Sequence, residues 1–214
     1  MPNKFDSKHL DPMLTRRSFL CIAATTVAGS VAAVAGAQSA ERAGAVEDVR
    51  GEAFAETAAV RRGLERAAPL FVGDQVGTGF QSRLAMRLGR ATVVRLGEQA
   101  RLTLDRFLVN AGGEITLQSG PMLFDRPASG APLPIQIRSP FGLIAVRGTR
   151  FFAGPSNARF GVFVERGSVV VSAAGRQVVV RAGEGSDIPY PGAAPTPAVR
   201  WGEPRIRAAL ESVR

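Results

Sequence analysis

Carboxylates are the side chains of this sequence that could support catalysis. They include Asp74, Glu98, Asp105, Glu114, Asp125, Glu165, Glu184 and Asp187. Two acids that face each other across a sugar can cleave a glycosidic bond. Most of these acids stand at the edges of predicted turns or at alternate positions of predicted strands, where a solvated carboxylate is the ordinary state. We therefore predict no catalytic residue and a protein that is not an enzyme.

Two pairs of polar residues could bind a ligand. If the strand around them alternates, Arg147 and Thr149 share a face opposite Val146, and Asp74 and Thr78 flank a predicted turn. An arginine in such a place can bind phosphate or a carboxylate ligand, but pairing with a carboxylate of its own chain, as a structural clamp, is commoner. We favour the clamp. Asp74 and Thr78 are likewise predicted to cap the turn, because calcium needs several clustered oxygen ligands.

The only histidine, His9, and the only cysteine, Cys21, lie within the first 37 residues. If this leader is removed, the remaining chain can form no disulfide of its own, no zinc site from Cys or His, and no His-based triad. The sequence also contains no recognisable nucleotide loop, haem motif or metal cluster. We predict neither a metal nor a cofactor.

Residues 1–37 are organised like a signal peptide. Arg16-Arg17-Ser18-Phe19-Leu20 precedes the apolar run Cys21–Ala37, which ends in A-x-A sites that allow cleavage after Ala35 or Ala37. The adjacent arginines resemble the twin-arginine export signal. We predict export to the periplasm. The alternative is an uncleaved inner-membrane anchor, although a run this rich in Ala, Gly, Ser and Thr is weakly apolar for a stable span.

The chain after the leader is basic through arginine alone. The leader holds four of the 27 basic and two of the 18 acidic residues, which leaves 23 basic and 16 acidic residues and a net charge of +7. All 23 are arginines, and only Arg61-Arg62 are adjacent. Because they are interleaved with acids and apolar residues, we predict a solvated surface and no nucleic-acid partner. A weak preference for glycans or other anionic surfaces stays open.

Short apolar segments separated by turn residues fill residues 38–188. Gly89, Gly97, Gly112-Gly113 and Gly120 separate successive segments, and Asp125–Pro134 is the longest break. This spacing predicts an all-β domain with many short strands, arranged as a sandwich, barrel or solenoid without a strict repeat. Separate strands are predicted at Ala100–Leu104 and Phe107–Asn110, whereas Thr57–Ala68 fits either a helical turn or the arm of a hairpin.

The domain is organised around Arg138–Gly154. Two apolar runs, Phe141–Val146 and Phe151–Ala153, flank the polar sequence R-G-T-R. β-Branched and aromatic residues favour strands, and a glycine within such a stretch marks a kink or a close approach of another backbone. We predict a strand, a glycine kink and a second strand, with an arginine on either side of the kink.

The C-terminal part is predicted as a proline-rich linker, residues 189–203, and a short helix, residues 204–214. Ile206, Leu210 and Val213 share one helical face. We expect the helix to dock on the domain and Trp201 to pack there. The alternative is a partner-binding helix on a tether.

Three segments resemble the FecR domain. Leu70–Gly79 is similar to its opening motif L-x-x-G-D-x-V-x-T-G, Val146–Phe151 to its V-R-G-T-x-F signature, and Val164–Val171 to the V-x-x-G-x-V-x-V segment that follows. The matching signature positions are Gly73, Asp74, Thr78, Gly79, Arg147, Gly148, Thr149, Phe151 and Gly167. The similarity extends over residues 46–187, and V-R-G-T-x-F is its specific part.

The resemblance implies an all-β domain that lies outside the cytoplasmic membrane. The best-known members relay iron–siderophore signals from an outer-membrane transporter to a cytoplasmic sigma factor. Here only a short leader precedes the domain, and few residues follow Asp187, so we expect a stand-alone exported domain without that sigma-factor role.

Together these features predict a non-catalytic binding or interaction module of the cell envelope, sensory or signalling in role, with an envelope protein as its partner. The first alternative is an envelope protein that binds or cleaves polysaccharide. A second is a structural envelope protein whose C-terminal helix docks on a partner.

Overall fold

The computed structural model describes residues 41–57, 60–108, 112–127, 135–146 and 148–214. The predicted signal peptide with Arg16 and Arg17, the start of the predicted domain, Arg147 and most of the predicted loop Asp125–Pro134 lie outside the described residues. Within those ranges, no helix is both long enough and apolar enough to cross a membrane.

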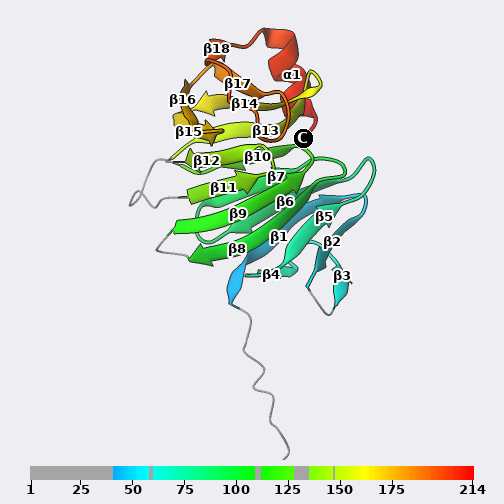
Figure 1. The fold of residues 1–214 in the computed structure, drawn as a ribbon. Helices are drawn as coiled ribbons and strands as arrows, with labels where there is room; N and C mark the ends of the chain where they lie inside the picture. Colours follow the sequence, from blue (N-terminus) through cyan, green and yellow to red (C-terminus); the bar gives the residue numbers. More distant parts are fainter. Residues whose placement is uncertain (1–40, 58–59, 109–111, 128–134, 147) are drawn as a thin grey trace, which may run out of the picture. The chain divides into compact units, whose positions relative to one another are not determined.

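The described residues form short strands and one helix (Figure 1). In chain order they are β1 (Arg42–Arg50), β2 (Ala53–Glu56), β3 (Arg61–Gly63), β4 (Pro69–Phe71), β5 (Gln75–Thr78), β6 (Arg83–Leu88), β7 (Thr92–Leu96), β8 (Arg101–Leu108), β9 (Gly112–Ser119), β10 (Met122–Asp125), β11 (Ile135–Ser139), β12 (Gly142–Val146), β13 (Arg150–Ser156), β14 (Arg159–Arg166), β15 (Ser168–Ala173), β16 (Arg176–Arg181), β17 (Glu184–Ile188), β18 (Val199–Arg200) and α1 (Glu203–Glu211).

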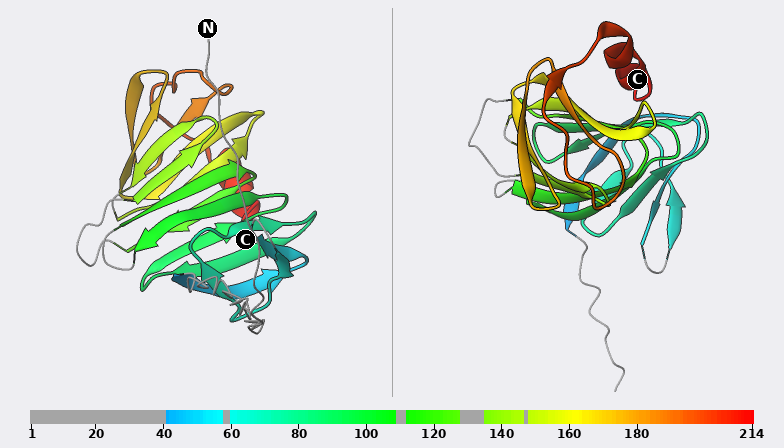
Figure 2. Two further views of the ribbon diagram at one scale, coloured as in Figure 1. Left: turned by 60° about the horizontal axis from the view of Figure 1, so that its bottom comes forward. Right: turned by 45° about the horizontal axis from the view of Figure 1, so that its top comes forward.

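The strands form two nine-stranded sheets. The first sheet has the order β18-β17-β14-β13-β10-β7-β6-β1-β4, and the second has the order β16-β15-β12-β11-β9-β8-β5-β2-β3. The chain passes repeatedly from one sheet to the other. As a result, the order of the strands across each sheet nearly follows their order in the sequence (Figure 2). This arrangement confirms the predicted all-β fold with many short strands and a short C-terminal helix, although the sheets do not close into a barrel.

A continuous apolar core fills the space between the sheets. β6 directs Leu84, Met86 and Leu88 inward, and β7 directs Val94 and Leu96 inward, all of them fully buried. The residues that alternate with them within the two strands are more exposed, and three of these are arginines: Arg83, Arg87 and Arg95. This period-two pattern is the one expected of a sheet with one face on the core and the other toward water.

A second cluster explains why β10, β13 and β14 lose that alternation. Leu123, Phe152 and Phe163 point away from the main core, yet they are buried together with Trp201, Ala209, Leu210 and Val213. Helix α1 therefore covers the outer face of the first sheet, with Ile206 packed at the border of the cluster. The helix docks on its own domain, as expected.

The residues before α1 are also held against the domain. Thr196 accepts a hydrogen bond from the backbone N–H of Asp187 (2.9 Å) through its hydroxyl, and its carbonyl accepts one from Ser186 (2.7 Å). Strand β18 pairs with β17, and Trp201 stacks on Phe163 with ring centroids 5.3 Å apart. The segment predicted as a linker is thus fixed along much of its length.

The strand pairing decides three local predictions. The strands predicted at Ala100–Leu104 and Phe107–Asn110 are not separate. β8 runs unbroken from Arg101 to Leu108, with a register irregularity between Thr103 and Arg106, and Asn110 lies outside the described residues. The ambiguous segment Thr57–Ala68 contains a hairpin arm, β3, paired with β2. The predicted kink after Val146 is a crossover, because β12 belongs to the second sheet and β13 to the first.

Candidate functional site

The opening motif forms the turn between β4 and β5. The Asp74 carboxylate is buried, accepts a hydrogen bond from the backbone N–H of Phe71 (2.9 Å) and pairs with Arg62 of β3. Gly73 has a φ of +91°, which a residue with a side chain adopts only at a cost. Asp74 therefore caps the turn and ties it to a neighbouring strand.

Thr78 and Gly79 join two loops at the other end of β5. The Thr78 hydroxyl donates to the carbonyl of Gly97 (2.6 Å) and accepts from the backbone N–H of Ala100 (3.0 Å). The Gly79 N–H donates to the carbonyl of Glu52 (2.9 Å). Asp74 and Thr78 form no hydrogen bond with each other, and no group of three or more acids, histidines or cysteines within the described ranges could hold a metal ion.

The signature segment meets the later glycine motif directly. A Cβ on Gly167 would lie 2.7 Å from Cγ2 of Thr149 and 3.0 Å from the carbonyl oxygen of Gly148. Thr149 is fully buried, and Phe151 is buried against Phe124, with ring centroids 5.4 Å apart. The two motifs therefore specify one tight backbone contact between the β12–β13 crossover and the β14–β15 turn.

Arg150, rather than the undescribed Arg147, is the arginine that the structure shows as a clamp. It donates to Asp125 of β10 (2.8 Å) and to Glu165 of β14, while Arg166 also donates to Asp125 (2.8 Å). Burial, the largest single influence, lowers the pKa of Arg150, but the hydrogen bonds and charges of Glu165 and Asp125 outweigh it and raise that pKa above the ordinary arginine value. This clamp joins three adjacent strands of the first sheet.

Each of the candidate catalytic acids accepts a hydrogen bond from another group of the protein. Asp125 and Glu165 converge, but on the guanidinium of Arg150. The others accept hydrogen bonds: Asp74 from Arg62, Glu98 from the N–H of Gln81, Asp105 from Thr116, Glu114 from Arg138, Glu184 from the N–H of Arg181, and Asp187 from Arg205. Asp125 and Glu165 are therefore paired with arginine, and this pairing links adjacent strands.

The two groups of signature residues are not brought together. In the second sheet, β8, β9 and β11 stand between β5 and β12. Within the described residues, each group makes local contacts that stabilise a turn or a crossover.

The two signature threonines, Thr78 and Thr149, differ in the hydrogen bonds that their hydroxyl groups form. Both are buried, but the Thr149 hydroxyl has no hydrogen-bond partner within the described protein atoms, whereas the Thr78 hydroxyl has two good ones. We expect Thr78→Val to lower the free energy of unfolding by about 2–3 kcal/mol, because it leaves buried backbone groups unsatisfied. Thr149→Val should leave it unchanged or raise it by about 1 kcal/mol. Urea denaturation of both variants checks the contrast, and equal losses would contradict it.

An apolar groove with a volume of about 370 Å³ lies at one end of the two sheets. We call it the end groove. It is lined by the end of β9 with the following turn (Leu117–Gly120), by Phe141 before β12, by Pro155, Ala158, Arg159 and Phe160 around the β13–β14 turn, and by Pro189–Pro191 after β17. Strand ends from both sheets therefore contribute to it.

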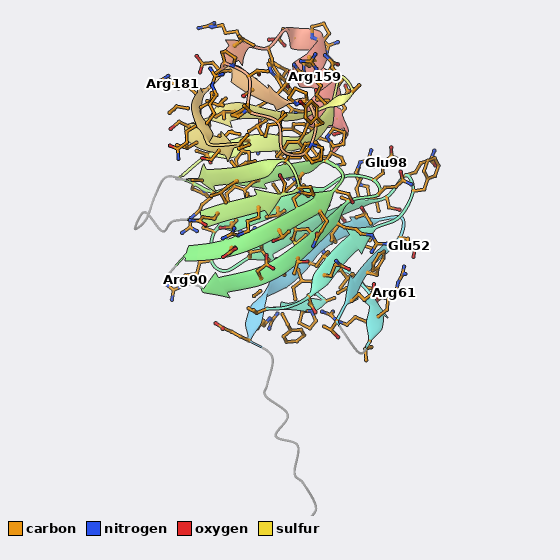
Figure 3. The ribbon with its side chains drawn as sticks, in the orientation of Figure 1. Glu52, Arg61, Arg90, Glu98, Arg159 and Arg181 are labelled. Carbon is orange, nitrogen blue, oxygen red and sulfur yellow. The ribbon has the colours of Figure 1, made fainter. Side chains whose placement is uncertain are left out.

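Aromatic rings give the end groove its character. Phe141 and Phe160 stack almost in parallel, with centroids 4.6 Å apart and planes 9° apart. Tyr190 is 67% exposed at the same site. Arg159, the one charged residue of the lining, is exposed and is the first residue of β14 (labelled in Figure 3). The surface suits an apolar segment that carries a negative charge beside it.

Sequence reasoning did not find the end groove. Phe141 belongs to an apolar run, and Pro189–Pro191 to the segment predicted as a linker, so neither pattern indicates a binding surface. Only the pairing of the strands brings these segments to one place.

Comparison with known proteins confirms the predicted family resemblance. Residues 74–170 match the family model described as "FecR protein". No curated protein sequence matches the chain.

Two crystal structures share the fold. Both are of a protein from Parabacteroides distasonis ATCC 8503 described as a "putative anti-sigma factor", solved at 1.65 Å and 2.50 Å resolution. Each match covers 64% of the present chain, with 15% sequence identity and a TM-score of 0.53. The match spans 64% and 63% of those two chains, so the similarity concerns the fold of a part of them.

Proposed function

We propose that this chain is an exported, non-catalytic FecR-like module of the cell envelope that binds a partner protein in a sensory or signalling process. The end groove is the observation that carries the proposal. Its stacked rings and exposed tyrosine offer an apolar surface on strand ends from both sheets. Aromatic anchors of this kind contribute much of the binding energy at protein interfaces.

The FecR domain supports a regulatory role over a catalytic one. The matched family and the structurally similar protein described as a putative anti-sigma factor both belong to regulation. The engagement of the convergent acids Asp125 and Glu165 by Arg150 agrees with that assignment. The partner segment that fits the end groove is apolar, with an acidic residue placed to meet Arg159.

Affinity capture from envelope extract tests partner binding. The chain without its leader should retain a discrete envelope protein, and Tyr190→Glu should reduce its retention at least about tenfold, because a charge replaces an aromatic anchor. Val179→Glu is the matched control, since Val179 is a 45% exposed residue of β16 that does not line the end groove. Retention of carbohydrate in place of protein would replace this proposal with the polysaccharide-binding alternative.

The export route is part of the proposal and rests on the leader. We expect the double substitution Arg16→Lys and Arg17→Lys to hold the precursor in the cytoplasm, because the twin-arginine signal requires both arginines. Fractionation and immunoblotting measure the distribution. Lys8→Arg, which leaves the arginine pair intact, is the control, and a mature-sized periplasmic product from the double variant would contradict the route.

A further inference from the structure

A second hollow, of about 350 Å³, lies on the outer face of the first sheet beside the end of α1. Arginines dominate its lining: Arg50 of β1, Arg83 of β6, Arg95 of β7, and Arg214 after the helix. It shares no lining residue with the end groove. We call it the arginine hollow.

The register of the strands explains why this place is hollow. Ala85 of β6 pairs with Asp48 on one side and Arg95 on the other, and Arg50 pairs with Arg83. Ala85 is the smallest residue of the set, so long side chains surround a short one. Val213 and Arg214, which follow α1, complete the wall.

The charges of the arginine hollow are not balanced. Of its two acids, Asp48 pairs with Arg50 (3.7 Å) and Glu47 pairs with Arg87. Within the described residues, Arg83 and Arg95 form no ion pair. Two guanidinium groups from adjacent strands therefore contribute uncompensated positive charge to the hollow.

Arg83 also has an unused donor. Its Nη1 donates to the carbonyl of Ser82 (2.9 Å), but its Nε–H is buried and has no acceptor within the described protein atoms. A buried N–H without an acceptor is costly, and a guanidinium offers parallel donors that match the oxygens of phosphate or carboxylate.

We propose that the arginine hollow binds an oxyanion, a phosphate or a carboxylate group, through Arg83 and Arg95. Both groups present the negative oxygens that the unpaired guanidinium donors require. Because Arg214 lies beside the site, a bound anion also adds a contact between the sheet and the segment after α1. This inference is independent of the end groove and of its partner.

Titration of the chain without its leader, followed by the Arg83 Nε–H resonance in nitrogen-15 NMR, tests the proposal. The probes are inorganic phosphate and glucuronate, each added at constant ionic strength against sodium chloride. We expect saturable shifts with one or both probes and none with chloride. Saturation by one probe alone would identify that anion class, and saturation by both would show that the site accepts either.

Variants separate binding at the site from general attraction to a basic surface. Arg95→Gln and Arg83→Lys should each weaken binding about tenfold or more, the second because lysine keeps the charge but lacks the guanidinium fork. For Arg83→Lys, backbone amide shifts replace the lost Nε–H signal. Arg176→Gln, on the exposed β16, should leave affinity unchanged. Non-saturable shifts, equal shifts with chloride, or equal losses in all three variants would overturn the proposal.

Discussion

Gly167→Ala is expected to lower the free energy of unfolding by about 2–5 kcal/mol. Gly167 has a φ of +84°, a conformation that costs a residue with a side chain about 1–2 kcal/mol. The new methyl group would also lie 2.7 Å from Cγ2 of the buried Thr149, and crowding of this kind costs about 1–3 kcal/mol. Urea denaturation followed by circular dichroism measures the loss.

The fold supplies a matched control for that substitution. Gly175, in the turn between β15 and β16, has a φ of +73°, but a Cβ there would meet no atom within 4 Å. Gly175→Ala should therefore lose only the backbone contribution, about 1–2 kcal/mol. Equal losses at the two glycines would show that the contact between Gly167 and the signature segment does not matter for stability.

Trp201→Ala is expected to cost about 3–5 kcal/mol, the range for removal of a large buried aromatic side chain. Trp201 is 7% exposed and stacks on Phe163. The guanidinium of Arg205 lies 3.5 Å from its ring centroid, and Arg205 in turn holds both carboxylate oxygens of Asp187 (2.6 and 3.1 Å). Loss of the indole removes the centre of the cluster on which α1 rests.

Two further variants, Trp201→Phe and Tyr190→Ala, serve as controls for the stability loss expected of Trp201→Ala. Phenylalanine retains part of the stacking and should lose less than alanine, whereas the 67% exposed Tyr190 should contribute little to folding. Thermal and urea unfolding compare the three variants. A loss below about 1 kcal/mol for Trp201→Ala would mean that α1 is not an integral part of the domain.

The elements that could be predicted from sequence are those with strong local patterns. Short, partly alternating runs such as Leu84–Leu88 and Ala91–Leu96, separated by Gly89, indicate an all-β fold. The spacing of Ile206, Leu210 and Val213 indicated a helix with one apolar face, and that face lies on the domain. The V-R-G-T-x-F segment identified the family because its residue order is specific.

The candidate sites could not be predicted, because they depend on pairing between segments distant in sequence. Arg150 is adjacent to Thr149, yet only the registers of β10, β13 and β14 show that it meets Asp125 and Glu165. The arginine hollow likewise needs β1, β6 and β7 in register. The separation predicted between Ala100–Leu104 and Phe107–Asn110 is wrong, because the polar pair Asp105-Arg106 interrupts the apolar pattern without ending the strand, and β8 runs through it.

Site-specific photo-crosslinking in cells tests the central claim, that the end groove binds a protein partner, most directly. The variant Tyr190→p-benzoylphenylalanine places the reactive group in the groove, and Val179→p-benzoylphenylalanine places it on β16, outside the groove. We predict one discrete protein adduct from position 190 and none from position 179. No protein adduct at position 190, or the same adducts from both positions, would contradict the claim.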